Sequence, residues 1–485
     1  MIWQALWGLV LAGLLCYTFL RAWRWEHGEK PELLFGEKYG TETYVLVLPT
    51  VLFWILLAFL VILTARLGVK EGFVRFAGLA GEVLLLLSVY FLLLLALLPL
   101  LRRFISARVC ALLWLVPAFL FWQAHALIRV LPMPRRTIYV PRRALPIIAA
   151  IWLAGFLAVG GYYLISHLRF RARVRDVTYP ERDAEALALW EREREALDYR
   201  RPVALLRGKI AAPFSMGRTK QSRCTVLPER DYTPEELSMI FRHELRHLQR
   251  CDVNTKVFFC LCNAACWFDP LVWLATRKAA EDLERSCDEI VTEGMDEEER
   301  RAYAKLLLDA AAPAHGCTTC LSAAAGTLRY RLKSVMDRRR RLSGLPLLMA
   351  AVFCTALCFG TVAFSDARGS FTALLLPEDT QIGHIYRIGT DGSITYDPDM
   401  EWDEAALRAA LDGVELEHVA GLRGQTTVGE GIELTLTGAG MRLLCLTRGG
   451  VTVIDVSGVS VTDCYVLRSA VDWDAIEAAL EPEAP

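Results

Sequence analysis

The sequence predicts a multi-span α-helical membrane protein that carries a mainly helical domain and, at its C-terminus, a small α+β domain. Three observations lead to this fold class. Hydrophobic residues make up 54% of the 485 residues, and many of them gather in uncharged runs. One amphipathic helix carries the pattern H-E-x-x-H. Beyond about residue 366, short β-branched runs alternate with glycine and aspartate, which is typical of strands joined by turns.

The uncharged runs are predicted to cross a lipid bilayer, because a helix of about 20 apolar residues spans its hydrocarbon core. They lie near residues 2–20, 44–64, 78–101, 110–131, 145–166 and 345–364. The first run has no basic leading segment and no small-residue cleavage site, so we expect an anchor and not a signal peptide. The fourth contains Pro117, Gln123 and His125, and a re-entrant segment is an alternative there.

Arginine predicts the orientation of these spans. Arginines between His167 and Arg175 follow the fifth run, and Arg338 to Arg341 precede the sixth. Dense positive charge beside a span favours the cytoplasmic side, and a contact with lipid headgroups is favoured there over nucleic acid. The formal net charge of −1 gives no support for direct nucleic-acid binding. The expected organisation in the cell membrane is a leader of about five spans (1–166), a cytoplasmic domain (167–342), a final transmembrane helix (343–365) and an extracytoplasmic α+β domain (366–485).

The pattern H-E-x-x-H consists of His243, Glu244 and His247. On a helix, the two histidines lie one turn apart on one face and can bind one Zn²⁺, while the glutamate acts as a base on a water molecule. Thr233 and Glu236 upstream predict a capping box, so the helix itself is expected to form. The competing interpretation is two solvated histidines on a charged helix.

A third metal ligand is predicted on a second helix, where Glu284 and Asp288 stand one turn apart. Glu284 can complete a His, His, Glu site with the fourth position open, and Asp288 can accept the free ring N–H of a metal-binding histidine. Without H-E-x-x-H, such a pair would be read as a solvated helix face.

The stretch between the two motifs, residues 257–276, is apolar enough to pass for a membrane span. As one straight helix it would hold His247 and Glu284 about 30 Å apart, so we predict a break at Asp269-Pro270 and a helical hairpin. The sequence leaves open whether the apolar surface of this hairpin is domain core or lies against the bilayer.

Three ordered runs, at residues 243–252, 267–273 and 283–288, resemble the BlaR/MecR peptidase family of membrane-bound antirepressor metalloproteases. The similarity covers about residues 165–340. It implies a zincin-like (gluzincin) peptidase domain with Zn²⁺ as cofactor, His243, His247 and Glu284 as metal ligands, and Glu244 as general base. Residues 213–217 match a family stretch near the cleft, although by themselves they indicate a Gly/Pro loop.

The C-terminal region departs from the family's β-lactam sensors, because no Ser-x-x-Lys nucleophile motif follows Ser365 and the penicillin-binding domain is therefore lacking. We expect helices near 403–411 and 473–480 in this region, which could act as a sensor or dock a partner. Cys445 and Cys464 could form a disulfide if the region is extracytoplasmic. The C-x-x-C pair Cys317 and Cys320 is not expected to be a second metal or redox site.

The expected function is that of a zinc metalloendopeptidase in signal transduction. The resemblance implies cleavage of the protein itself, of a cytosolic regulator such as a transcriptional repressor, or of both; a homodimer remains open. One alternative is a non-catalytic membrane receptor or scaffold, against which the intact base Glu244 argues. Another is an HtpX-like quality-control protease, against which residues 267–273 and the pair Cys287-Asp288 argue.

Overall fold

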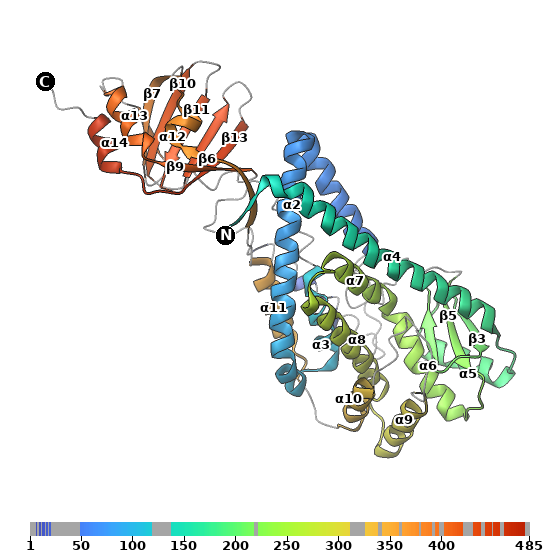
Figure 1. Cartoon of the computed structure of the whole chain (residues 1–485). Coiled ribbons are helices and arrows are strands. Elements are labelled where there is room, and N and C mark those ends of the chain that lie inside the picture. Colours follow the sequence, from blue (N-terminus) through green and yellow to red (C-terminus); the bar gives the residue numbers. More distant parts are fainter. Residues whose placement is uncertain are drawn as a thin grey trace.

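The structure is a computed structural model that describes parts of residues 6–20, then 49–118, 137–217, 222–310, 325–337, 342–357 and, with short gaps, 361–480. Figure 1 shows the helical H-E-x-x-H domain at one end, a β-rich C-terminal region at the other, and the long helices α2 and α4 between them.

Two helical segments among the described residues are long and apolar enough to cross a membrane: Gly68–Phe104 and Arg142–Val177. The first belongs to α2 (Pro49–Phe104), which bends at Gly68 where φ is 79°. The second contains α4 (Leu145–Val177), whose apolar stretch is only 6% buried. They include the runs predicted at 78–101 and 145–166. The multi-pass topology as a whole remains a prediction, because about half of the run at 2–20 and the start of the run at 44–64 lie outside the described residues.

The run at 110–131 differs from the predicted span as far as it is described. Helix α3 covers only Ala107–Leu113 and is buried throughout. The Glu289 carboxylate accepts hydrogen bonds from the backbone N–H groups of Ala107 and Arg108, at 2.6 and 3.3 Å. A helix that is buried throughout and whose first N–H groups bond to a half-buried carboxylate of α8 belongs to the protein interior, not to a lipid-facing span.

The run at 345–364 also differs from its prediction. Helix α11 covers Leu345–Leu357, and the chain is already a strand, β6, at Thr361–Ser370. β6 pairs in parallel with β1 (Thr137–Pro141) and antiparallel with β9 (Glu415–Ala420). These ladders satisfy the backbone groups that a continued helix would have bonded internally, and the β-branched Thr361 and Val362 suit a strand.

The domain that follows α4 in the chain combines a small sheet with helices. Its strands run in the order β2-β3-β5-β4, so β4 is an edge strand. The prediction of a loop at 213–217 is wrong for its middle residues, which form β4 and pair antiparallel with β5. The elements are β2 (Thr178–Pro180), α5 (Ala184–Ala196), β3 (Ala204–Gly208), β4 (Phe214–Met216), β5 (Cys224–Pro228), α6 (Pro234–Gln249), α7 (Asp252–Ala265), α8 (Pro270–Val291), α9 (Glu297–Ala310) and α10 (Ala325–Met336).

The helix α6 forms as its sequence predicts. Thr233 and Glu236 make the capping box, and the apolar stripe of α6 is buried. Phe241 packs edge-on against Trp190 of α5, with ring centroids 5.0 Å apart. The predicted break is also confirmed: α7 ends before Asp269, whose side chain accepts from Leu271 N and starts α8. The hairpin therefore folds back and brings α8 beside α6.

The C-terminal region is a nine-stranded sheet with order β1-β6-β9-β13-β12-β11-β10-β7-β8. Helices α13 (Glu404–Asp412) and α14 (Trp473–Leu480) confirm the two predicted helices. The sheet takes in β1, which directly precedes α4, so it begins earlier in the chain than the predicted boundary at residue 366. The remaining elements are α12 (Phe371–Leu375), β7 (Gln381–Ile388), β8 (Ile394–Tyr396), β10 (Gly431–Thr437), β11 (Arg442–Thr447), β12 (Gly450–Asp455) and β13 (Ser460–Leu467).

The register of this sheet rules out a disulfide between Cys445 and Cys464. Thr452 of β12 pairs with Cys445 on one side and with Cys464 on the other. Two strand spacings separate the cysteines by roughly 9–10 Å, beyond the Cα distance that a disulfide bridges. Neither cysteine forms a disulfide, and the Cys445 thiol donates a hydrogen bond to Glu433 at 3.1 Å.

Candidate metal centre

Helices α6 and α8 bring three predicted ligand side chains together. The Nε2 atoms of His243 and His247 lie 3.1 Å apart. The Oε2 atom of Glu284 lies 3.7 Å from Nε2 of His243 and 3.4 Å from Nε2 of His247. Its other oxygen, Oε1, lies 3.5 Å from Nζ of Lys256. Two imidazole nitrogens and one carboxylate oxygen thus converge on one point.

Cys287, one turn after Glu284 on α8, also reaches this cluster. Its sulfur and the ring nitrogens of His243 and His247 all lie within 4.8 Å of one another. The thiol is engaged as well, because it donates to the backbone carbonyl of His243 at 3.4 Å. The arrangement therefore offers two candidates for a third ligand, whereas in the sequence Cys287 had been noted as part of the family motif and not as a ligand.

Hydrogen bonds to the outer ring nitrogens fix how both histidines face the cluster. Nδ1 of His247 donates to Asp252 Oδ2 at 2.7 Å. The Tyr303 hydroxyl lies 2.8 Å from Nδ1 of His243 and donates to Asp288 Oδ1, also at 2.8 Å, so Nδ1 of His243 is the donor to Tyr303. With each Nδ1 bonded to an outer partner, both Nε2 atoms face the cluster, which is how a metal-binding histidine is normally oriented.

Asp288 is therefore connected to His243 mainly through Tyr303, since its own Oδ1 lies 3.5 Å from Nδ1 of that histidine. Its second partner is Arg331 of α10. The guanidinium donates from Nε and Nη2 to the two Asp288 oxygens, both at 2.7 Å, and its Nη1 lies 3.5 Å from Glu284 Oε2. One arginine thus contacts both Asp288 and Glu284, and its planar fork suits a carboxylate better than an ammonium group would.

Glu244 lies in the same helix as the histidines but has a different environment. Its side chain is 5% exposed, and its Oε2 atom has no hydrogen-bond partner. A buried carboxylate oxygen without a partner is costly and is found where a functional group is to be bound. The position of Glu244 fits a base that meets a water molecule at the metal.

The electrostatics of the cluster favour a cation. Burial by itself would lower the pKa of His247, but the neighbouring Cys287 and Glu284 raise it well above its ordinary range. Burial would likewise raise the pKa of Glu284, yet His247 and Lys256 lower it well below the usual value. Anionic donors that hold buried imidazoles in their charged form would hold a divalent ion in the same place.

Three residues of the site were not identified from the sequence: Asp252, Tyr303 and Arg331. Asp252 had a signal, since it closes the run that begins at His243 and stands at the first position of α7. Tyr303 and Arg331 had none. They lie on α9 and α10, and only the packing of those helices against α8 brings them to Asp288.

The donor set of two imidazoles and a carboxylate, with oriented outer partners, fits Zn²⁺ or a similar divalent ion. Comparison with known proteins agrees with this chemistry. The family model described as BlaR1 peptidase M56 matches residues 123–335. The regulatory protein BlaR1 of Bacillus licheniformis is 26% identical over 162 residues, which cover 33% of this chain and 26% of that protein. The chain thus matches about a quarter of the length of that relative. These similarities, on top of the shared motifs, support the BlaR/MecR-type family for the peptidase region of the chain.

Proposed function

We propose that the protein is a membrane-anchored zinc metalloendopeptidase of a signal-transducing type. One observation carries the proposal: the two Nε2 atoms and the Glu284 carboxylate converge, and the residue next to His243 in α6 is a buried glutamate, Glu244, whose Oε2 atom has no hydrogen-bond partner. A site that only bound a metal would have no use for such a base.

His243, His247 and Glu284 would hold the ion. We favour Glu284 over Cys287 as the third ligand, because its Oε2 approaches both imidazoles while the Cys287 thiol already bonds the backbone of α6. When bound, the ion would act as a Lewis acid on the peptide carbonyl. Glu244 would take a proton from the attacking water and return it to the leaving amine.

The edge strand β4 supports a peptide as the substrate. β4 pairs with β5 on one side only, and it packs against α6. The free edge of such a strand can bind an extended peptide through backbone hydrogen bonds. A peptide bound there would run past the helix that carries Glu244.

The biological substrate is inferred from the relative, which is named as a regulatory protein. We infer that this peptidase cleaves itself, a cytosolic regulator such as a repressor, or both. The arrangement of α4 supports a transmembrane relay, because Arg169 to Arg175 lie at its peptidase end while β1, at its other end, pairs with β6 of the C-terminal sheet. The two domains would then lie on opposite sides of the membrane, with the peptidase in the cytoplasm.

The test compares Glu244→Gln with Glu235→Gln, an exposed glutamate on the same helix. Glu244→Gln should retain zinc and lose cleavage by at least about 100-fold, because a general base contributes about that much or more. Glu235→Gln should retain both. Zinc content is measured on purified protein, and cleavage by sequencing new N-termini in the protein and in co-expressed cytosolic proteins.

If Glu244→Gln cleaved as fast as wild type, the mechanism would be wrong. A third variant, Glu284→Ala, should lose zinc. Unchanged zinc affinity in that variant would refute only the ligand assignment and point to Cys287 instead.

A further inference from the structure

We propose that the tip of the α7–α8 hairpin is embedded in the bilayer beside α4, with its outward face against lipid acyl chains. The inference rests on the membrane anchoring proposed above. It adds a contact surface for lipid and a location for the cleavage reaction.

The composition of the hairpin permits this position. Asp269 is the only ionisable acidic or basic side chain among residues 257–276. Its carboxylate accepts a hydrogen bond from the backbone N–H of Leu271 at 2.8 Å and so caps the N-terminus of α8. The first N–H groups of a helix have no partner within the helix, and this hydrogen bond satisfies one of them. It thereby lowers the free-energy cost of placing the turn in hydrocarbon.

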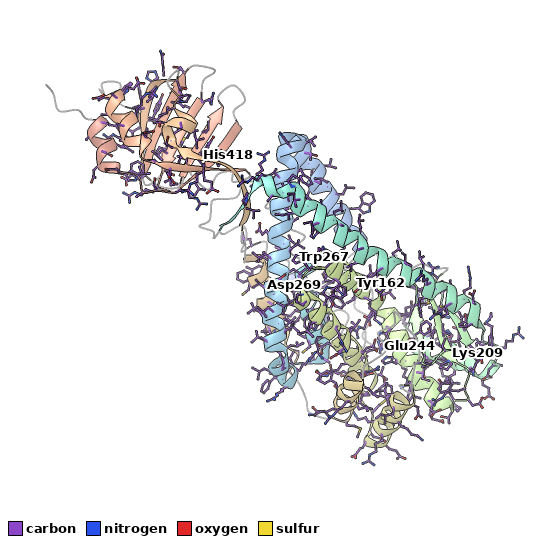
Figure 2. All side chains as sticks on the ribbon, viewed as in Figure 1. Tyr162, Lys209, Glu244, Trp267, Asp269 and His418 are labelled. Atoms are coloured by element: carbon purple, nitrogen blue, oxygen red, sulfur yellow. The ribbon has the colours of Figure 1, made fainter. Side chains whose placement is uncertain are left out.

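The contacts with α4 place the tip deep in its apolar stretch. Trp152 of α4 donates from Nε1 to the carbonyl of Ala265 at 2.8 Å, and Trp267 donates from Nε1 to the carbonyl of Trp152 at 3.2 Å. A Cβ added at Gly155 would lie 2.1 Å from the Trp267 ring, so the two segments touch closely. Trp152 is about 25 Å along the helix from Arg169, which marks the charged end of α4. Figure 2 shows Trp267 and Asp269 at the end of the hairpin remote from Glu244.

Polar groups of the hairpin and of α4 also pair with one another, closer to the charged end of α4. Asn263 donates to the Tyr163 hydroxyl of α4 at 2.9 Å and accepts from Thr276 Oγ1 at 2.9 Å. The Tyr163 ring also stacks on Trp273, with centroids 6.3 Å apart. Such pairing is what a bilayer requires of amide and hydroxyl groups within it.

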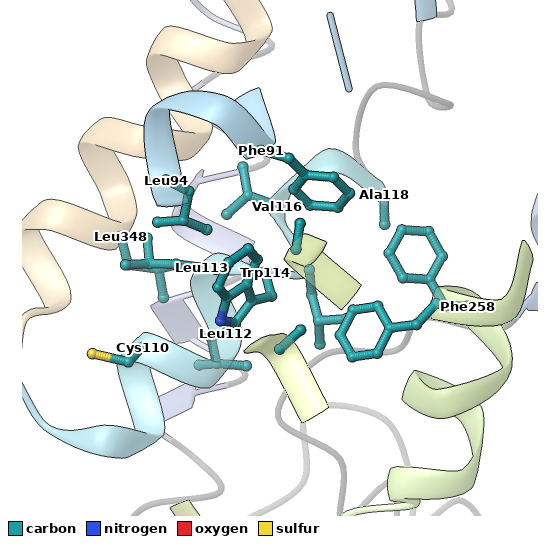
Figure 3. Packing of buried hydrophobic residues seen from close by; sticks show 14 of the residues in the cluster. Phe91, Leu94, Cys110, Leu112, Leu113, Trp114, Val116, Ala118, Phe258 and Leu348 are labelled. Atoms are coloured by element: carbon teal, nitrogen blue, oxygen red, sulfur yellow. The ribbon is translucent and has the colours of Figure 1, made fainter. Parts of the chain in front are cut away.

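The two faces of the hairpin differ. Its inner face joins the largest apolar cluster, in which Phe258 packs with residues of α2, α3 and α11 (Figure 3). Its outer face leaves Phe268 54%, Leu274 46% and Trp273 37% exposed. The neighbouring helix α4 is exposed as well, with Leu157 61% exposed. An exposed apolar surface beside a lipid-facing helix fits the same environment, the acyl chains.

The embedding also locates the metal centre. α7 starts at Asp252, which holds His247, and its 14 residues extend about 20 Å toward the tip. With the tip inside the hydrocarbon core, whose half-thickness is about 15 Å, the metal centre lies at the membrane surface. The substrate class that fits this position is an extended peptide segment at or near the cytoplasmic surface of the bilayer.

The experiment uses full-length Glu244→Gln protein in nanodiscs that contain phosphatidylcholine with a diazirine at the end of one acyl chain. After photolysis, mass spectrometry maps the lipid adducts. We expect adducts on residues 267–274 and on α4. Two matched controls, Tyr179 and Leu308, are 43% and 50% exposed but lie on β2 and α9, and they should remain unlabelled.

Each other outcome decides against the inference. Adducts on α4 without adducts on the hairpin would overturn the embedding and leave the anchored peptidase intact. Adducts on neither segment would refute the membrane anchoring as well. Equal labelling of the hairpin and both controls would show adsorption of lipid to exposed apolar residues and no embedding. A second lipid with the diazirine beside the headgroup should label residues 267–274 several-fold less, and stronger labelling than from the chain end would place the tip at the surface.

Discussion

The metal centre and the C-terminal sheet are held together in opposite ways. In the centre, Glu244, Asp252 and Asp288 are buried, and the partners of the two aspartates come from α6, α9 and α10. The core of the sheet consists of apolar side chains such as Leu407, Leu444 and Ile476. Its antiparallel strands mostly pair with close neighbours along the chain. From this difference we expect that single polar substitutions disable the centre, whereas the sheet responds mainly to the loss of apolar volume.

The largest effect is expected from Arg331→Ala. This change leaves Asp288 buried without its bidentate partner and releases Glu284, at a cost of roughly 3–5 kcal/mol for an uncompensated buried charge. Zinc affinity should fall by about 10- to 100-fold, as is usual when an outer partner of a ligand is lost. Competition with a chromophoric chelator measures the affinity.

Two controls accompany this variant. Arg329→Ala removes an exposed arginine from the same helix and should change nothing. Arg331→Lys keeps the charge without the fork and should restore only part of the affinity. Equal zinc affinity in Arg331→Ala and wild type would mean that the centre does not depend on α10.

The matching change in the sheet is Leu444→Ala, at a side chain with no exposure. It should destabilise the C-terminal region by about 2–5 kcal/mol through lost burial and a cavity. Zinc affinity should be unaffected, because no residue of the centre belongs to this core. Ile394→Ala, at a 58% exposed position of β8, is the control and should have little effect. Calorimetry resolves the unfolding; a loss of zinc in Leu444→Ala would show that the two regions are coupled.

A smaller effect is expected from pH. The adjacent anionic groups raise the pKa of His243 to about 10, although burial alone would lower it. They also raise the pKa of His247. Protons therefore compete with the metal on both imidazoles, and zinc affinity should increase as the pH rises from about 6 to 8. Isothermal titration in buffers of different ionisation enthalpy would detect the released protons. Binding without proton release would contradict this picture of the centre.

No effect is expected from oxidation of the sheet. Cys445 and Cys464 flank Thr452 on separate strands and cannot meet without breaking the ladder. When the unfolded protein is alkylated, each of the two thiols should be labelled to the same extent with and without prior reduction. Labelling that appears only after reduction would contradict the strand order, and with it the contrast between the two regions.

The sequence by itself determined the local chemistry. The spacing of His243 and His247, the capping box at Thr233 and the proline after Asp269 each act within one or two helical turns, so they could be read directly. The same holds for α13 and α14 of the C-terminal region. Glu284 could be proposed because a catalytic zinc site requires a third ligand and a turn was available to bring it back.

Only the tertiary structure decided which distant groups complete the centre. Arg331 and Tyr303 reach Asp288 because α9 and α10 pack onto α8, and no local pattern marks them. The limits of the apolar helices were decided in the same way: α3 begins where Glu289 caps it, and the last run turns into β6 because β1 and β9 pair with it. The hydrophobicity of a segment determines that it is removed from water. The elements that pack against it or pair with it determine whether it becomes a span, a buried turn or a strand.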